Sequence, residues 1–124
     1  MTPFRIGIIC LSALLAASGC SEQPREMPPT EEQIHANDSG DASKIPGRHP
    51  YRCDANRPLL VDFKDEGLTL ELRPDARAAP VVLTAPAQGL QYVGDAISAS
   101  FTDNELKIEE AGKRPVLCRK ETSL

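Results

Sequence analysis

The clearest pattern in this 124-residue sequence is a pair of alternating segments near its middle. Apolar side chains occupy every second position in both: Leu59, Val61 and Phe63 in the first, and Leu68, Leu70 and Leu72 in the second. Successive side chains of a β-strand point to opposite faces, so each segment predicts a strand with one buried face. Asp65-Glu66-Gly67 lies between them and supplies turn residues, so we expect a hairpin.

Similar short segments continue from His49 toward the C-terminus, separated by turn residues. We expect strands over 81–84, 89–93, 96–101, 105–108 and 115–118, and no segment shows a helical period. Short strands with a turn every few residues are typical of antiparallel sheets that close into a barrel, because closure leaves no exposed strand edge. The sequence therefore predicts an all-β fold, a small antiparallel β-barrel.

The N-terminal segment fits a secretion signal. Arg5 precedes an apolar stretch of about a dozen residues, which is too short to span a bilayer. The stretch ends in Leu15-Ala16-Ala17-Ser18-Gly19-Cys20, which resembles the lipobox of bacterial lipoproteins, although Ala17 stands where leucine is more usual. The resemblance implies that residues 1–19 are removed and that Cys20 is acylated. The alternative is an ordinary signal peptide with an incidental cysteine.

Acyl chains on Cys20 would anchor the protein to a membrane. Ser21 follows, and by resemblance to lipoprotein sorting a residue other than aspartate there favours the outer membrane, so we expect a location in the cell envelope, facing the periplasm. Residues 20–48 are rich in proline, glutamate and serine and poor in apolar residues. We expect a disordered tether over this range, which leaves 49–124 as the folded domain.

Two cysteines remain in the expected mature domain. Cys10 lies in the removed signal and Cys20 is the lipid acceptor, so only Cys53 and Cys118 can pair, in a compartment where thiols are oxidised. Their bridge would close a loop of about 65 residues and stabilise the domain by about 4 kcal/mol. A metal pair and a reactive thiol are the alternatives, but both lack nearby ligands. His49 is the only histidine near either cysteine.

The remaining polar residues indicate no enzyme and no cofactor. The net charge is −4 and there is no basic run, which argues against nucleic acid as a partner. Asp62, Asp95 and Asp103 could be imagined as acid and base groups. Yet both histidines, His35 and His49, lie at or before the start of the domain, and no Ser-His-Asp or paired-carboxylate pattern is present. We interpret the acids as surface charge and expect no metal site.

A set of motifs resembles the membrane-bound inhibitors of C-type lysozyme. Its elements, in chain order, are Tyr51-Arg52-Cys53, Leu59-x-Val61-x-Phe63, Gly89-x-x-Tyr92 and Val116-x-Cys118. The resemblance covers about 51–119, essentially the whole expected domain. It implies a barrel of eight antiparallel strands, with a disulfide between Cys53 and Cys118 that ties the first strand to the last.

The first inhibitory segment of that family resembles Ser-Ala-Ser-Gly-x-Arg-Tyr, whose second serine enters the lysozyme cleft. It falls on 86–92, where Gly89 and Tyr92 match, Gln88 stands at the second serine and Gln91 at the arginine. The Gln88 amide can donate a hydrogen bond in place of the serine hydroxyl. The resemblance thus implies a lysozyme-contact loop with Gln88, Gly89 and Tyr92.

The second family segment resembles Trp-x-Lys-Gly-x-Glu-Ala, whose lysine also reaches the cleft. Aligned without gaps on 100–106, it matches only at Glu105, and Thr102 stands at the lysine. Placing Phe101 at the tryptophan would put Asp103 at the lysine instead. Thr102 would keep a neutral donor, whereas an inward Asp103 would meet the carboxylates of the cleft with like charge.

These patterns lead to two hypotheses. The first is a lipid-anchored inhibitor that blocks the cleft of C-type lysozyme with Gln88, Gly89, Tyr92, Thr102 and Asp103 at its contact surface. The second keeps the fold but changes the partner to another periplasmic protein or a cell-wall component. The first hypothesis requires that the two contact segments project side by side from one rim of the barrel.

Overall fold

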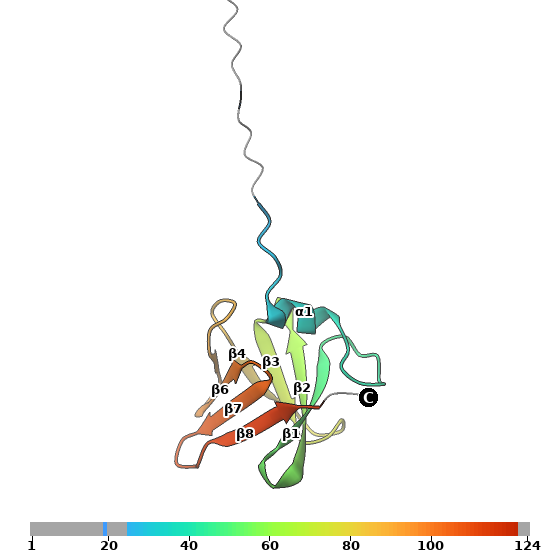
Figure 1. The fold of residues 1–124 in the computed structure, drawn as a ribbon. Helices are drawn as coiled ribbons and strands as arrows, with labels where there is room; N and C mark the ends of the chain where they lie inside the picture. Colours follow the sequence, from blue (N-terminus) through green and yellow to red (C-terminus); the bar gives the residue numbers. More distant parts are fainter. Residues whose placement is uncertain (1–18, 20–24, 122–124) are drawn as a thin grey trace, which may run out of the picture.

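The fold is a closed barrel of eight antiparallel strands with one short helix at its end (Figure 1). The computed structural model describes Gly19 and residues 25–121. Residues 1–18, Cys20 and Ser21, on which the predicted signal and lipid anchor depend, lie outside the described residues. Within the described part of the chain, no helix is long and apolar enough to cross a membrane.

The strands follow one another around the barrel in chain order, and β8 closes onto β1. Their bounds are β1 Arg48–Cys53, β2 Arg57–Lys64, β3 Thr69–Arg73, β4 Val81–Thr84, β5 Tyr92–Val93, β6 Ile97–Thr102, β7 Glu105–Glu110 and β8 Val116–Lys120. Short 3-10 turns, η1 Asp54–Asn56 and η2 Asp65–Gly67, join β1 to β2 and connect β2 toward β3. The predicted all-β barrel is confirmed.

The predicted hairpin is confirmed residue by residue. Val61 lies opposite Leu72 and Phe63 opposite Leu70, so the alternating apolar side chains of β2 and β3 share the inner face. The strand expected over 89–93 is shorter, since only Tyr92 and Val93 pair in β5. Gly89 has a left-handed backbone with φ of +78°, which an extended strand does not accept, so the chain before Tyr92 forms a loop.

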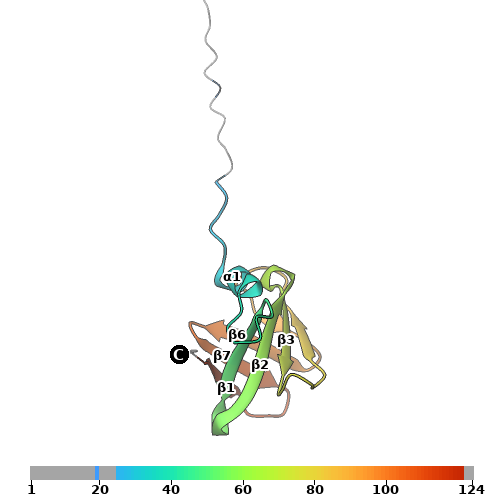
Figure 2. The same ribbon diagram turned by 90° about the vertical axis from the view of Figure 1, so that its right-hand side faces the viewer.

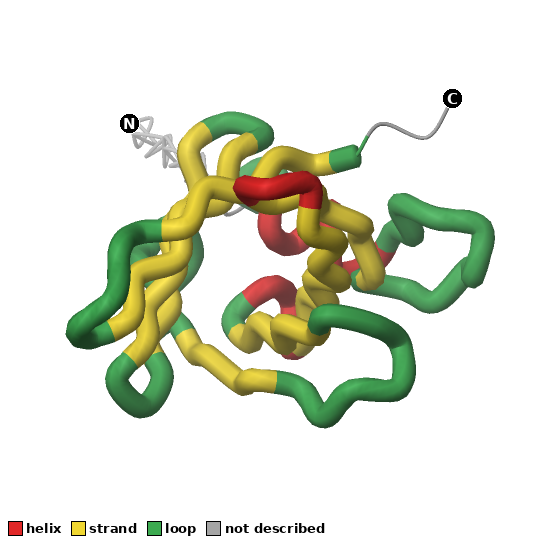
Figure 3. Tube along the Cα trace, turned by 90° about the horizontal axis from the view of Figure 1, so that it is seen from below, coloured by secondary structure: helices red, strands yellow, loops and turns green. Residues whose placement is uncertain are grey.

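The barrel interior is packed across its middle. Figure 3 looks along the barrel from below and shows the strands arranged around it. A central layer of apolar side chains, one each from β2, β3, β4, β6, β7 and β8, is fully buried: Val61, Leu70, Leu83, Ala99, Leu106 and Cys118. Since this layer leaves no exposed surface, the barrel is a solid core, and any binding surface must lie at its ends or on its outside.

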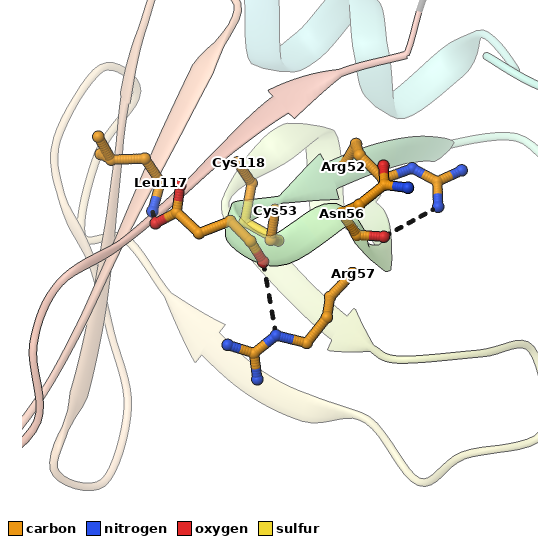
Figure 4. The surroundings of a disulfide bond; sticks show 7 residues. Arg52, Cys53, Asn56, Arg57, Leu117 and Cys118 are labelled. Carbon is orange, nitrogen blue, oxygen red and sulfur yellow. Dashed lines mark hydrogen bonds between the residues drawn. A yellow bond between two sulfur atoms is a disulfide. The ribbon is translucent and has the colours of Figure 1, made fainter.

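The predicted disulfide joins the first and last strands. Cys53 of β1 lies directly opposite Cys118 of β8, and the two sulfur atoms are bonded (Figure 4). Asp54, next to Cys53, accepts a hydrogen bond at its carboxylate from the Leu117 backbone N–H at 3.1 Å. The bridge and this bond hold the seam where the barrel closes.

The prediction of a disordered tether over 20–48 is wrong from Thr30 onward. Helix α1, Glu31–Asn37, packs against η2, β1 and β2 at one end of the barrel (Figures 1 and 2). Thr30 and Gln33 form a capping box: the Thr30 hydroxyl accepts from the Gln33 N–H at 3.3 Å, and the Gln33 side chain accepts from the Thr30 N–H at 2.9 Å. The helix is stable despite its length because it rests on the barrel.

The connection from α1 to β1 is also fixed in place, and with α1 it forms what we call the cap, residues 30–47. The Gly47 N–H donates to the Asp38 carbonyl at 2.6 Å, and the Phe63 N–H donates to the Gly47 carbonyl at 2.8 Å. Gly67 is in direct contact with α1, since a Cβ there would lie 2.6 Å from backbone atoms of Glu32. The folded unit therefore begins at Thr30, and the stretch left for a tether ends at 29.

Candidate protein-binding rim

Both predicted contact segments lie at the same end of the barrel. In a barrel of neighbouring antiparallel strands, every second connection falls at one end. The β2–β3, β4–β5 and β6–β7 connections therefore share an end, as does α1, which lies opposite the β1–β2 hairpin (Figures 1 and 2). We call this end the capped rim and the other the opposite rim. The loop 85–91 and the turn 103–104 are successive connections on the capped rim.

The 85–91 loop presents its backbone at Gly89 rather than the Gln88 side chain. The Gln88 amide N–H donates to the Glu66 carbonyl at 2.6 Å, and its oxygen accepts from the Thr30 hydroxyl at 2.8 Å. These bonds tie the loop to the cap and to η2. Around Gly89 the loop is open, because no atom outside its chain neighbours lies within 4 Å of the position of a Cβ on Gly89, and Leu90 is 54% exposed.

Tyr92 is a core residue and not a contact residue. Its side chain is only 2% exposed, and its hydroxyl donates to the Gly67 carbonyl. Burial raises the pKa of the Tyr92 hydroxyl, so it stays a donor at neutral pH. Tyr92 therefore supports the rim from inside the barrel, and the contact role expected for it is wrong.

The β6–β7 turn exposes the other two predicted residues. Thr102 and Asp103 are both exposed, and Thr102 pairs with Glu105 across the turn. Asp103 has a left-handed backbone with φ of 54°, a conformation that favours glycine and tolerates aspartate. The gap-free alignment puts the glycine of the family pattern at this position, and the left-handed geometry therefore favours Thr102, rather than Asp103, as the counterpart of the lysine.

A cavity of about 300 Å³ separates α1 from the β6–β7 turn. Both aromatic and carboxylate side chains line it; the lining residues are Glu31, Glu32, His35, Tyr51, Phe63, Phe101, Asp103 and Asn104. Burial lowers the pKa of His35, and the Lys120 ammonium and His49 lower it further, so the imidazole is neutral at pH 7. The lining of this cavity thus carries negative charge.

The opposite rim differs in character. Its cavity, of about 350 Å³, is lined mostly by apolar side chains, among them Leu59, Leu72, Val81, Ile97, Ile108 and Val116. No predicted contact residue lies there.

The acids considered for an enzyme are not brought together. Asp62 lies on β2, where its carboxylate pairs with Arg48 at 2.8 Å and Arg73 at 3.1 Å. Asp95 lies in the β5–β6 connection on the opposite rim, and Asp103 lies on the capped rim. Asp62 and Asp95 thus share neither a surface nor a cavity with Asp103.

Three side chains that the sequence analysis did not connect with one another lie close together in the structure. His35, Asp38 and His49 place donor atoms within 4.8 Å of one another where the cap joins β1. The signal that could have located them is the capping pattern Thr30-x-x-Gln33 with Glu31 and Glu32 in the first turn, which predicts a helix over a range interpreted as tether.

In comparisons with known proteins, no family model matches this chain, and no curated protein or solved structure matches it either.

Proposed function

We propose that this protein is a lipid-anchored inhibitor of C-type lysozyme that inserts its capped rim into the cleft of the enzyme. The observation that carries the proposal is the arrangement of the 85–91 loop and the 103–104 turn, which project from the same end of a disulfide-closed barrel. A second observation supports the alignment behind it. The glycines of the two family patterns fall on Gly89 and Asp103, and both positions have φ above +50°.

The electrostatics of the rim agree with this proposal. Glu31, Glu32 and Asp103 border the cavity beside the turn, and the chain as a whole carries a net charge of −4. C-type lysozymes are strongly basic, so complementary charge increases the rate of encounter at low ionic strength. The backbone N–H of Gly89 and the Thr102 hydroxyl then offer neutral donors to the carboxylates of the cleft.

The test is the lysis of cell-wall substrate by C-type lysozyme in the presence of the full chain. We expect lysis to slow with half-inhibition at micromolar concentration or below. Thr102→Lys supplies the missing charge at an exposed position, and a charge-assisted hydrogen bond is about twice as strong as a neutral one, so we expect tenfold stronger inhibition. Asp95→Asn on the opposite rim also makes the chain more positive by one charge, at a place where no contact is expected, so its inhibition should change only by the small effect of net charge.

Unchanged lysis with wild type and with Thr102→Lys at micromolar excess would reject the proposal. The second candidate, a barrel that binds another periplasmic protein or a cell-wall component at the same rim, would then take its place. One observation favours that candidate: the Gln88 side chain, which stands at the inserted serine of the family, is held by Glu66 and Thr30. Recovery of a different partner from periplasmic extract, with lysozyme passing through, would separate the two.

A further inference from the structure

The cap and the barrel meet at a cluster of metal-binding side chains. His35 lies on α1, Asp38 is the residue at which the helix ends, and His49 lies on β1. The His49 Nε2 atom is 2.7 Å from Asp38 Oδ1, and His35 Nδ1 is 3.7 Å from the same oxygen. We propose that these three side chains form a site for a divalent transition metal of the zinc class, which fastens the cap to the barrel.

The donor set selects the class of metal. Two imidazoles and one carboxylate suit zinc and its neighbours, whereas magnesium and calcium prefer oxygen ligands alone. Three protein ligands leave a fourth position for water. The backbone carbonyl of His35, which lies 3.0 Å from His49 Nε2, is a further oxygen at the same place.

The spacing of the donors is close to what zinc requires. Zinc bonds to nitrogen and oxygen at about 2.0–2.2 Å, so donors at a tetrahedral ion lie about 3.3 Å apart. The separations of 2.7 and 3.7 Å from Asp38 Oδ1 lie on either side of that value, and all three donor atoms lie within 4.8 Å of one another. Small side-chain movements therefore suffice, and Asp38 is free to make them because its side chain is 49% exposed.

His49 is held rigidly for this role. It is only 1% exposed, and its ring packs edge-on against Phe63 and against His35, at centroid distances of 5.6 and 4.7 Å. The two close neighbours of its Nε2 atom, Asp38 Oδ1 and the His35 carbonyl, are both acceptors, so a cation is favoured among the three atoms.

Lys120 would compete with the metal for one of its ligands, His35. Its ammonium lies 3.5 Å from His35 Nδ1, the nitrogen that would face the metal. The side chain is long and begins at the last residue of β8, so it can swing away when the metal binds. Removing its charge should therefore strengthen binding.

The experiment is a titration of zinc into the full chain, made without a polyhistidine tag and treated with a chelator beforehand. The sequence contains two histidines, and both are in the cluster. If cobalt is added in place of zinc, any imidazole that binds it must therefore come from this cluster. We expect one zinc ion per chain with a Kd in the micromolar range or below. His35→Gln and Asp38→Asn should each weaken binding at least tenfold, Asp95→Asn should not change it, and Lys120→Gln should tighten it.

Circular dichroism establishes that each variant is folded before its affinity is measured. Hydrogen exchange of the α1 amides gives an independent reading, because a metal that fastens the cap should slow their exchange. The absence of saturable zinc binding to the wild-type chain would overturn the proposal, as would wild-type affinity in both His35→Gln and Asp38→Asn. In that case the cluster is a hydrogen-bonded contact only.

Discussion

Replacing Cys53 and Cys118 together by serine is expected to lower the free energy of unfolding by about 4 kcal/mol, the cost of releasing a loop of about 65 residues in the unfolded chain. The bridge joins β1 to β8, the two strands at which the barrel closes, so its removal weakens the closure of the barrel. Small domains are stable by only about 5–15 kcal/mol, so the variant should lose a large part of its stability.

Denaturation by urea, followed by circular dichroism, measures this effect. The wild-type chain in a reducing agent is the matched control, because it should fall to the stability of the double variant, whereas the double variant should not respond to the reducing agent. A loss below 1 kcal/mol in both samples would mean that the hydrogen bonds between β1 and β8 hold the seam without the bridge.

The second large effect is expected from Asp62→Asn, which should destabilise the barrel by about 3 kcal/mol, because removing one partner of a buried ion pair leaves the other charges uncompensated. The Asp62 carboxylate is 3% exposed and binds two guanidinium groups, with Arg48 donating to both of its oxygens at 2.8 and 3.0 Å. Arg73 donates to it at 3.1 Å and also to Glu71 at 2.7 Å. The network spans β1, β2 and β3.

The same carboxylate predicts a pH dependence of stability. Burial raises the pKa of Asp62, but hydrogen bonds and charge from Arg48 and Arg73 outweigh this, so its pKa is below the ordinary value of 3.8. A depressed pKa in the folded state gives stabilisation that is complete above the unfolded pKa and is lost as the pH falls through the folded pKa. The difference in stability between wild type and Asp62→Asn should therefore shrink below about pH 4.

Urea denaturation at pH 7 and at several pH values below 4 checks both statements. The exposed Asp95→Asn serves as the control, and it should stay within about 0.5 kcal/mol of wild type. If the difference in the free energy of unfolding between Asp62→Asn and wild type stays constant across that range, the charge of Asp62 does not have the role described here. The destabilisation would then come from packing.

The barrel was predictable because its signal is local and repeated. Alternation of apolar residues in segments such as 59–64 and 68–73 decides which side chains face inward, and the turn residues between them decide where each strand ends. The pairing of Cys53 with Cys118 followed from the number of cysteines. Neither prediction required knowledge of which distant parts of the chain are in contact.

The cap was missed because its stability is not local. A seven-residue helix is marginal alone, and α1 persists because Gly67 leaves room for its backbone and the His35 ring packs on His49. The composition around it is typical of disorder, so a rule based on composition failed where tertiary contacts decide the outcome. The capping pattern at Thr30 was the one local sign of it.

The candidate site was predictable in its place but only in part in its chemistry. Connectivity alone puts the segments around Gln88 and Thr102 at one end of an up-and-down barrel. It does not show that Gln88 is bound to the cap, or that Tyr92 points into the core, because both depend on side-chain packing. A motif match cannot distinguish a residue that contacts a partner from one that supports the loop.

The most direct test of the proposed function is hydrogen exchange of the chain with and without an excess of C-type lysozyme. If the capped rim enters the cleft, exchange should slow in the 85–91 loop and the 102–105 turn, with no change in the 74–80 and 111–115 loops of the opposite rim. Protection confined to the opposite rim, or no protection at all, would contradict the account.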